Sequence, residues 1–507
     1  MSKLPWSLLL IATIAVAADN PETLAERSQS KGRDVIDAAV EAIGGADALQ
    51  SIKSVRLQLE GKTWPRLQMT TPEAPFEPGY FRESLLFDLG NNKLRLEQQN
   101  RGGGFEGHNV IVLGQQGGTN YDLRGRIATA IPAPQANQQQ FVQYHRRLPN
   151  LLLRQALNNA NSLRYLGEDQ FNGRKHDVVT FVMPDTQQIA LYVDAATRLI
   201  SKYELIFTDP LTGDDASEIM FSDYVAVGKL KAPQKWSWRI AGDMQAEYTA
   251  KAEFNPSVDE KSFEFADVGY QKVNAAPQNP EANVEKLADG VYVIHNVAGP
   301  NQNTLAVEFR DYILAVEAPG TSAGADSVIA RIKETIPNKP IRYIAMTHHH
   351  GDHIGGLRSF IAEGATVVTT ANNRATVERM TKAPQKDRLA KSPRKAEFSL
   401  LEKGRRVFTD GQQTVELIDI GPHPHAREMV VAYLPKQKIV FQGDLFFVPN
   451  NDAPFGPPQA GTISFAQSLK DKGLDVERIA SVHGKTATIE QFRQALAARA
   501  VPSAGAN

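Results

Sequence analysis

The chain has 507 residues, of which 42% are hydrophobic and 22% are charged, a composition typical of a globular protein with an apolar core. Its formal net charge is −1, so it lacks the overall positive charge with which a protein binds nucleic acid. The length is enough for two or three domains. The absence of cysteine excludes disulfides and a lipid-attachment cysteine.

The first residues, MSKLPWSLLLIATIAVAADN, have the pattern of a cleavable secretory signal. Lys3 precedes an apolar run of about a dozen residues, and small residues end the run at 15–18. The run is short for a membrane span, which needs about 20 apolar residues, although an uncleaved membrane anchor is the alternative. We therefore predict a signal peptide at residues 1–18 and a mature protein that is periplasmic or secreted.

The next segment is predicted to be a helix followed by a long series of strands. Residues 20–49 include RDVIDAAVEAIGG, in which apolar residues recur every three or four positions until two glycines end the pattern. Between residues 51 and 265, short segments alternate apolar and polar residues, as in SVRLQLEGK at 54–62. This pattern predicts a large antiparallel sheet or open barrel, with one helix at 141–157 lying over it.

This N-terminal region, predicted to span residues 20–272, resembles the periplasmic lipoprotein-carrier type of domain. The resemblance rests on AIGGADALQSIKSVRLQLEG at 42–61 and on a strand meander with Asn172 and Gly173 in one of its turns. It implies a curved sheet and contact with lipid through the N-terminal domain. The alternative is a β domain that only packs against its neighbour.

A segment rich in Pro, Asn and Ala at residues 273–283 is the predicted linker. Beyond it, two apolar strands precede an amphipathic helix at 323–336, and a buried strand, IRYIAMT at 341–347, leads into the sequence HHHGDH. A second domain is therefore predicted at residues 284–500, followed by a disordered tail at 501–507.

The segment MTHHHGDHIGG at 346–356 places four of the eleven histidines within six residues. In an extended segment residues two apart point the same way, so His348 and His350 can converge on one ion. A turn at the following glycine sends Asp352 and His353 toward a second point. A zinc site needs about four donors, drawn from His and carboxylates where Cys is absent, so both groups need further ligands.

Three further donors follow, each at the end of a predicted strand: His425, Asp444 and His483. The ends of strands in an α/β architecture are where loops assemble a site. Asp444 has two carboxylate oxygens and can bridge two ions. One ion would then take His348, His350 and His425 with Asp444, and the other would take Asp352, His353 and His483 with the same carboxylate.

With these residues the sequence is similar to the metallo-β-lactamase superfamily, whose signature is H-x-H-x-D-H followed by single His, Asp and His ligands. The match consists of His348, His350, Asp352, His353, His425, Asp444 and His483. The similarity covers residues 284–496 and implies an αββα sandwich, with two central sheets flanked by helices and the metals at one edge.

The resemblance also ranks the neighbouring residues. It favours His425 over His423 because His425 lies at the family's distance before the next strand, and it places Glu317 where the family often has Asp. Glu317 is expected to hydrogen-bond the metal loop or to cap a turn. His349 is expected to lie behind the ligands or on the surface. Four histidines without a partner pattern are expected to be solvated or satisfied in a core: His108, His145, His176 and His295.

The resemblance implies a hydrolase with two zinc ions, with iron or manganese as alternative metals. Two divalent ions can share a water, lower its pKa to about 7 and polarise a substrate carbonyl, and Asp352, beside that nucleophile, is the predicted catalytic proton shuttle. In the family, Asp at the 444 position is typical of thioesterases and lactonases. We therefore predict cleavage of an ester, lactone or thioester by a metal-bridging hydroxide.

Three alternatives remain at this point: a β-lactamase-like amide hydrolase, a periplasmic lipid- or lipoprotein-binding protein with a structural metal domain, and an iron-dependent redox enzyme. The loop Phe447–Gly461 is rich in Phe and Pro and is predicted to form an apolar substrate wall, or simply a rigid loop. The predicted partner is a partly apolar small molecule, with no nucleic acid.

Overall fold

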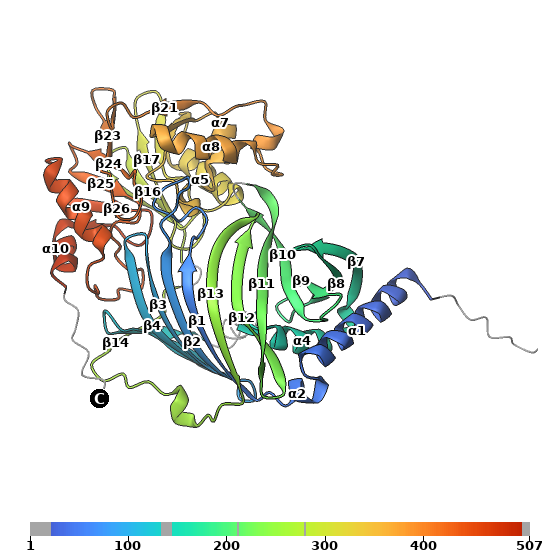
Figure 1. Cartoon of the computed structure of the whole chain (residues 1–507). Helices are drawn as coiled ribbons and strands as arrows, with labels where there is room; N and C mark the ends of the chain where they lie inside the picture. Colours follow the sequence, from blue (N-terminus) through green and yellow to red (C-terminus); the bar gives the residue numbers. More distant parts are fainter. Residues whose placement is uncertain (1–21, 133–143, 210–211, 278–279, 499–507) are drawn as a thin grey trace, which may run out of the picture.

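The computed structural model describes residues 22–132, 144–209, 212–277 and 280–498. The predicted signal peptide at 1–18 and the predicted tail at 501–507 lie outside these ranges. The described chain forms a large curved sheet and a sandwich that lies across one end of its strands (Figure 1). Within these ranges, no helix combines the length and the apolar character that crossing a membrane requires.

The large sheet has 14 strands in the order β14-β6-β5-β4-β3-β2-β1-β13-β12-β11-β10-β9-β8-β7. Neighbouring strands are antiparallel except β14 and β6, which are parallel. The strands are β1 (Ser54–Thr63), β2 (Gly79–Asp88), β3 (Lys93–Gly102), β4 (Phe105–Gly114), β5 (Gly117–Asp122), β6 (Ile127–Ile131), β7 (Arg164–Phe171), β8 (Arg174–Val182), β9 (Gln188–Asp194), β10 (Ile200–Asp209), β11 (Gly213–Val227), β12 (Leu230–Ile240), β13 (Asp243–Phe254) and β14 (Gln271–Val273). The predicted antiparallel β domain is confirmed.

Helices cover the apolar face of this sheet. The helix expected over residues 20–49 is divided into α1 (Leu24–Ile43) and α2 (Ala46–Gln50), because Gly44 has a φ of 135° and ends the first helix. Of the helix expected at 141–157, residues 141–143 lie outside the described ranges, Tyr144 and His145 are helical, and a turn separates them from α4 (Pro149–Asn158). At the start of α4 the missing proline N–H costs no helical hydrogen bond. Apolar side chains of these helices and of the sheet form one core.

The C-terminal part contains two stacked sheets. The seven-stranded sheet has the order β15-β16-β17-β18-β19-β20-β21, and the six-stranded sheet has the order β22-β23-β24-β25-β26-β27. The strands are β15 (Asn283–Ala288), β16 (Val291–His295), β17 (Asn303–Glu308), β18 (Ile313–Val316), β19 (Ile341–Ala345), β20 (Thr366–Thr369), β21 (Phe398–Leu400), β22 (Arg405–Thr409), β23 (Thr414–Asp419), β24 (Val430–Leu434), β25 (Ile439–Gln442), β26 (Arg478–Ser481) and β27 (Ala487–Thr488).

Helices lie on both outer faces of this pair. In β24, Val430, Ala432 and Leu434 enter the core between the sheets, whereas Val431 and Tyr433 enter the core beneath the C-terminal helices. Those helices are α9 (Ala460–Asp471) and α10 (Ile489–Ala497), and the other sheet is covered by α5 (Ser322–Thr335), α7 (Leu357–Glu363) and α8 (Ala371–Lys382). Each sheet thus has two buried faces, and the predicted αββα sandwich is confirmed.

Candidate metal centre

Five of the seven predicted ligands lie in loops at the ends of sandwich strands, and Asp352 and His353 lie in a short helix that follows one of these strands. His348 and His350 follow β19, just before the short helix α6 (Gly351–Ile354). His425 lies between β23 and β24, Asp444 follows β25, and His483 follows β26. The structure brings the side chains of all seven predicted ligands together in two groups that share Asp444.

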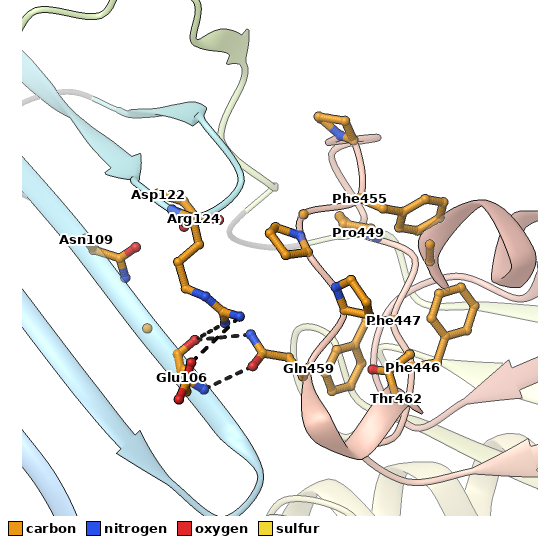
Figure 2. Close-up of a pocket in the computed structure, with 16 residues that line it drawn as sticks. Glu106, Asn109, Asp122, Arg124, Phe446, Phe447, Pro449, Phe455, Gln459 and Thr462 are labelled. Atoms are coloured by element: carbon orange, nitrogen blue, oxygen red, sulfur yellow. Dashed lines mark hydrogen bonds and ion pairs between the residues drawn. The ribbon is translucent and has the colours of Figure 1, made fainter. Parts of the chain in front are cut away.

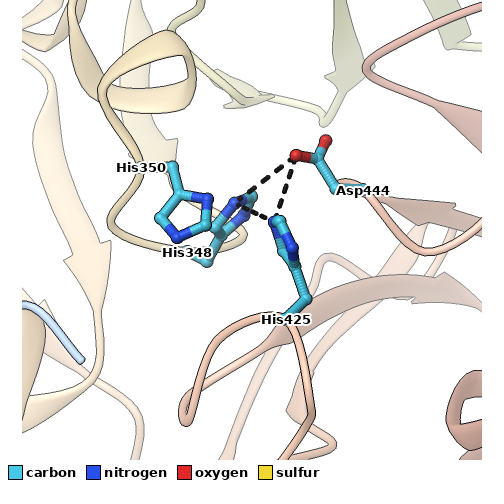
Figure 3. A group of neighbouring side chains, drawn as sticks. All are labelled: His348, His350, His425 and Asp444. Atoms are coloured by element: carbon cyan, nitrogen blue, oxygen red, sulfur yellow. Dashed lines mark hydrogen bonds and ion pairs between the residues drawn. The ribbon is translucent and has the colours of Figure 1, made fainter. Parts of the chain in front are cut away.

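The first group consists of His348, His350, His425 and Asp444 (Figure 3). Its candidate ligand atoms lie within 4.8 Å of one another. Asp444 Oδ2 is 3.1 Å from His425 Nε2 and 3.9 Å from His348 Nε2. His350 donates Nε2–H to the Met69 carbonyl, so its Nδ1, buried and without a hydrogen-bond partner, carries the free lone pair.

The second group consists of Asp352, His353, Asp444 and His483. Here Asp444 presents its other oxygen: Oδ1 is 3.1 Å from His353 Nε2 and 3.2 Å from His483 Nε2. Asp352 Oδ2 is 3.5 Å from His353 Nε2 and 3.4 Å from His483 Nε2. One carboxylate therefore faces both groups, one oxygen to each, which is the arrangement of a bridging ligand.

The histidine nitrogens that face away from the groups are held by acceptors. His353 Nδ1–H donates to Glu317 Oε2 at 2.7 Å, and His483 Nδ1–H donates to the Asn301 carbonyl at 2.7 Å. His425 Nδ1–H donates to the Gly103 carbonyl at 3.1 Å. Such acceptors set the tautomer and leave Nε2 as the donor for a metal. The expected hydrogen bond from Glu317 to the metal loop is confirmed.

The charges of the groups favour a cation. Burial, together with neighbouring imidazoles, holds the pKa values of His348 and His350 well below the usual range, so both rings are neutral donors. Burial also opposes a charge on His353, but Asp444, Glu317 and Asp352 outweigh it and hold that pKa well above 6.5. Asp352 and Asp444 likewise overcome burial and raise the pKa of His483 to about 9. His353 and His483 therefore hold protons that balance the carboxylate charge, and a bound cation would replace those two protons.

The remaining histidines are satisfied elsewhere. His423 donates Nε2–H to the Gly461 carbonyl and accepts the backbone N–H of His425, so both of its ring nitrogens are used, whereas His425 lies in the first group. The surface alternative for His349 is wrong: the side chain is buried and donates Nε2–H to the Met69 carbonyl. The four histidines without a partner pattern have ordinary hydrogen-bond partners: His108, His145, His176 and His295.

A cavity of about 280 Å³ opens onto His425 and Asp444. Its other lining residues come from the large sheet and its loops, among them Gln68, Tyr80 and Arg101. Sequence reasoning missed this contribution, because no local pattern marks residues that approach the ligands only through the packing of two domains.

The loop Phe447–Gly461 lines a second cavity, of about 360 Å³, together with β4 and β5 (Figure 2). The Phe455 ring packs against the core beneath the C-terminal helices, and the Phe447 ring lies 5.8 Å from the ring of His483. Gln459 ties the loop to the sheet by accepting the backbone N–H of Glu106 at 3.0 Å and donating to the Glu106 carbonyl at 3.1 Å. The loop is therefore fixed against the sheet, and its Phe447 end lies beside the second group.

The candidate centre lies within a match to the model of a known family. Residues 319–484, which contain all seven predicted ligands, match the family model of the metallo-beta-lactamase superfamily. A comparison with curated proteins found no match.

Three solved structures illustrate the structural similarity. The metallo-beta-lactamase from Pontibacter korlensis is 18% identical with a TM-score of 0.33, over 43% of this chain and 98% of that one. FIM-1 from Pseudomonas aeruginosa in its mono-zinc form is 23% identical with a TM-score of 0.31, over 44% and 96%. The stereoselective inverting sec-alkylsulfatase Pisa1 from Pseudomonas sp. is 16% identical with a TM-score of 0.33, over 43% and 41%.

Proposed function

Because residues 319–484 match the family model of the metallo-beta-lactamase superfamily, we propose that the protein is an exported hydrolase that binds two zinc ions and cleaves an ester, lactone or thioester. The observation that carries the proposal is the position of Asp444, whose two oxygens face two separate groups of donors. Export is part of the same proposal and rests on the apolar run at residues 1–18.

Each group has the donors for one cation. The first would be held by His348, His350, His425 and Asp444, and the second by Asp352, His353, His483 and Asp444. Two such cations supply an acidified water as nucleophile and an electrophile for the substrate carbonyl. The imidazoles, once His353 and His483 release their protons, and the shared carboxylate would supply the coordination, and oxygen and nitrogen donors of this kind suit zinc.

Asp352 is the residue best placed to move a proton. Its side chain is 35% exposed, whereas that of Asp444 is 10% exposed, so Asp352 is the carboxylate of the centre that solvent reaches. Its Oδ2 points toward the second group, where a reacting water would lie within reach. Asp352 would therefore accept the proton of the nucleophile and return it to the leaving group.

The surroundings of the centre support a partly apolar small molecule as substrate. The cavity over His425 and Asp444 holds about 280 Å³, and the neighbouring wall is formed by Phe447 and the prolines that follow it. The Asp ligand at position 444 favours an ester, lactone or thioester over a β-lactam. If the protein is instead a lipid carrier with a structural metal domain, no substrate is expected to be hydrolysed.

The test combines metal analysis with a substrate panel. Purified protein loaded with zinc is expected to hold about two zinc ions per chain and to hydrolyse at least one member of a panel of lactones, thioesters, aryl esters, β-lactams and phosphodiesters. His350→Ala and Asp444→Ala are expected to lower kcat/KM by about 100-fold or more, because each removes a ligand.

His108→Ala is the matched control. His108 lies on β4 and bonds Glu97, away from the centre, so its loss should leave zinc content and turnover unchanged. A zinc-free, folded protein that binds acyl chains and hydrolyses no member of the panel would refute the proposal in favour of the lipid carrier.

A further inference from the structure

The loop between β1 and β2, residues 64–78, lies on the sandwich directly beside the candidate centre. Gly351 N–H donates to the Leu67 carbonyl at 3.0 Å, and Arg427 N–H donates to the Thr70 carbonyl at 2.7 Å. Because Gly351 precedes two of the predicted ligands and Arg427 follows a third, these hydrogen bonds hold the loop on both sides of the centre.

Two backbone carbonyls of the sheet domain hold histidines of the first group. The Met69 carbonyl accepts Nε2–H of His350 at 2.9 Å, and the Gly103 carbonyl accepts Nδ1–H of His425 at 3.1 Å. In each ring the other nitrogen is left to face the group. A carbonyl can only accept, so the sheet domain decides which nitrogen of each ring can bind a cation.

A side chain of the same loop reaches the second group. Gln68 Nε2 donates to Asp352 Oδ1 at 2.7 Å, while Asp352 Oδ2 lies 3.4 Å from His483 Nε2. The Asp352 side chain is 35% exposed, so burial alone does not orient it. The amide donor occupies one oxygen, prevents the carboxylate from turning, and leaves the other oxygen facing the group.

The backbone just before Gln68 is held in an unusual conformation. Leu67 has a φ of 56°, in the left-handed region that leucine rarely adopts. Such a conformation persists only where the surrounding structure imposes it. Here the Leu67 carbonyl is bonded to Gly351, and the turn presents Gln68 to Asp352.

We propose that the sheet domain is a working part of the metal centre and that Gln68 is the positioning residue for Asp352. The contacts from Met69 and Gly103 orient ligands of the first group, and the contact from Gln68 orients a ligand of the second. This inference rests on the proposed function, because it assigns to the sheet domain a role in the same centre.

The test measures zinc binding and turnover separately in the full-length chain. Gln68→Ala removes the side chain, and Gln68→Glu keeps its size but replaces the N–H donor with an acceptor. Zinc affinity is measured by titration against a competing chelator that resolves two binding steps. Thermal unfolding and kcat/KM are measured on the same preparations.

Gln467→Ala is the matched control. Gln467 lies on α9 and its amide donates to Asp471 Oδ1, also at 2.7 Å and also in an exposed position. The variant therefore removes the same kind of hydrogen bond without touching the centre. Its zinc affinity, turnover and unfolding temperature define the effect of a surface substitution.

In both Gln68 variants, the zinc ion at the second group is expected to bind at least about tenfold more weakly than in Gln467→Ala. The first binding step and the unfolding temperature of the zinc-free protein should match the control. The proposal is overturned if both binding steps equal those of the control, or if both steps weaken equally along with the unfolding temperature.

The two proposals fail in different ways. If the wild-type protein binds two zinc ions but hydrolyses nothing, the proposed function is lost while the titration still decides the role of Gln68. If it turns over substrate and the Gln68 variants match the control, the function stands and the positioning role is lost.

Discussion

At the scale of single residues, Glu317 shows how much of the centre depends on side chains that are not among its predicted ligands. It is fully buried and accepts hydrogen bonds from His353 Nδ1–H and from the backbone N–H of Thr347. Its φ of 79° lies in the left-handed region, which is unfavourable for glutamate. The two hydrogen bonds that its oxygens accept offset the cost of this backbone conformation.

Glu317→Gln is expected to weaken the second zinc site by about tenfold to 100-fold. The amide has one oxygen, so it satisfies either His353 or Thr347 and points an N–H group at the other donor. The unmatched buried donor should also lower the free energy of unfolding by about 1–3 kcal/mol. Zinc titration and denaturant unfolding measure the two effects.

Glu285→Gln is the control for this substitution. Glu285 Oε2 also accepts from a histidine, His295, at 2.9 Å, and from Thr486 at 2.7 Å, but it lies outside both groups. Zinc affinity should be unchanged in this variant. An equal loss of zinc affinity in both variants would contradict the role assigned to Glu317.

A buried ion pair elsewhere in the sandwich gives the protein an acid-sensitive contact. Arg358 of α7, with a side chain 2% exposed, holds Asp387 through Nε at 2.5 Å and Nη2 at 2.9 Å. Burial raises the pKa of Asp387, but the hydrogen bonds from Arg358 and from the Ala390 backbone outweigh it and lower the pKa to about 2.

Asp387→Asn is expected to lower the free energy of unfolding by about 3 kcal/mol at neutral pH, because it leaves the buried Arg358 charge without this carboxylate as counter-charge. The folded pKa lies below the ordinary value of 3.8, so the unfolded chain binds the proton first as the pH falls. The difference between wild type and variant should therefore be full above pH 3.8 and shrink toward pH 2.

Denaturant titrations at neutral and acidic pH, with a chelator present throughout, measure this difference. Glu253→Gln, which breaks the exposed pair between Arg56 and Glu253, should change stability by less than about 1 kcal/mol. A difference for Asp387→Asn that stays constant down to pH 2 would rule out the ion pair as its cause.

At the scale of elements, the turn between β3 and β4 is the second point at which the sheet reaches the centre. Gly104 has a φ of 78°, and a Cβ there would lie 3.1 Å from the Pro424 carbonyl carbon and 3.2 Å from His425 N. The glycine thus serves both the turn and the close approach. The approach brings the Phe105 ring to 5.0 Å from the ring of His425.

Gly104→Ala is expected to push the turn away from the His425 loop and to weaken zinc binding at the first group by about tenfold, because His425 loses its carbonyl acceptor. The second group should be less affected. Gly173→Ala is the control: its φ is 72°, but a Cβ there meets nothing within 4 Å. Gly173→Ala should lower the stability of the protein because alanine disfavours a positive φ, without a loss of zinc affinity. Equal zinc affinities in Gly104→Ala and Gly173→Ala would contradict the prediction.

At the scale of the whole molecule, the sandwich supplies the ligands and the sheet supplies several of the groups that orient them. The sandwich lies across the ends of the strands in Figure 1, and the contacts continue beyond the centre. Arg379 of α8 pairs with Glu73 of the β1–β2 loop at 2.5 Å, and Gln459 bonds Glu106. The domain whose role sequence reasoning left open is therefore joined to the candidate centre on several sides.

Much of this arrangement follows from local patterns. The alternation in segments such as 54–62 predicted strands, since one face of a sheet is buried, and the 3–4 spacing before Gly44 predicted a helix. The histidines and aspartates that follow apolar strands predicted seven ligands, because donor type and strand ends are visible in the chain itself. The preference for His425 over His423 came instead from the resemblance to the metallo-β-lactamase superfamily.

Other features depend on the tertiary structure. Which oxygen of Asp444 faces which group depends on contacts within the sandwich. The hydrogen bond of buried His349 to Met69 and the contacts of Gln68 and Gly103 arise where the two domains pack together. Gln68 and Asp352 are 284 positions apart, and no periodicity relates them. The residue types and spacings of the sequence by itself determined which side chains can bind metal and which strands carry them. Only the tertiary structure, within the sandwich and where the sheet packs against it, decided how those side chains are oriented, because a hydrogen bond between distant segments requires a geometry that local patterns do not contain.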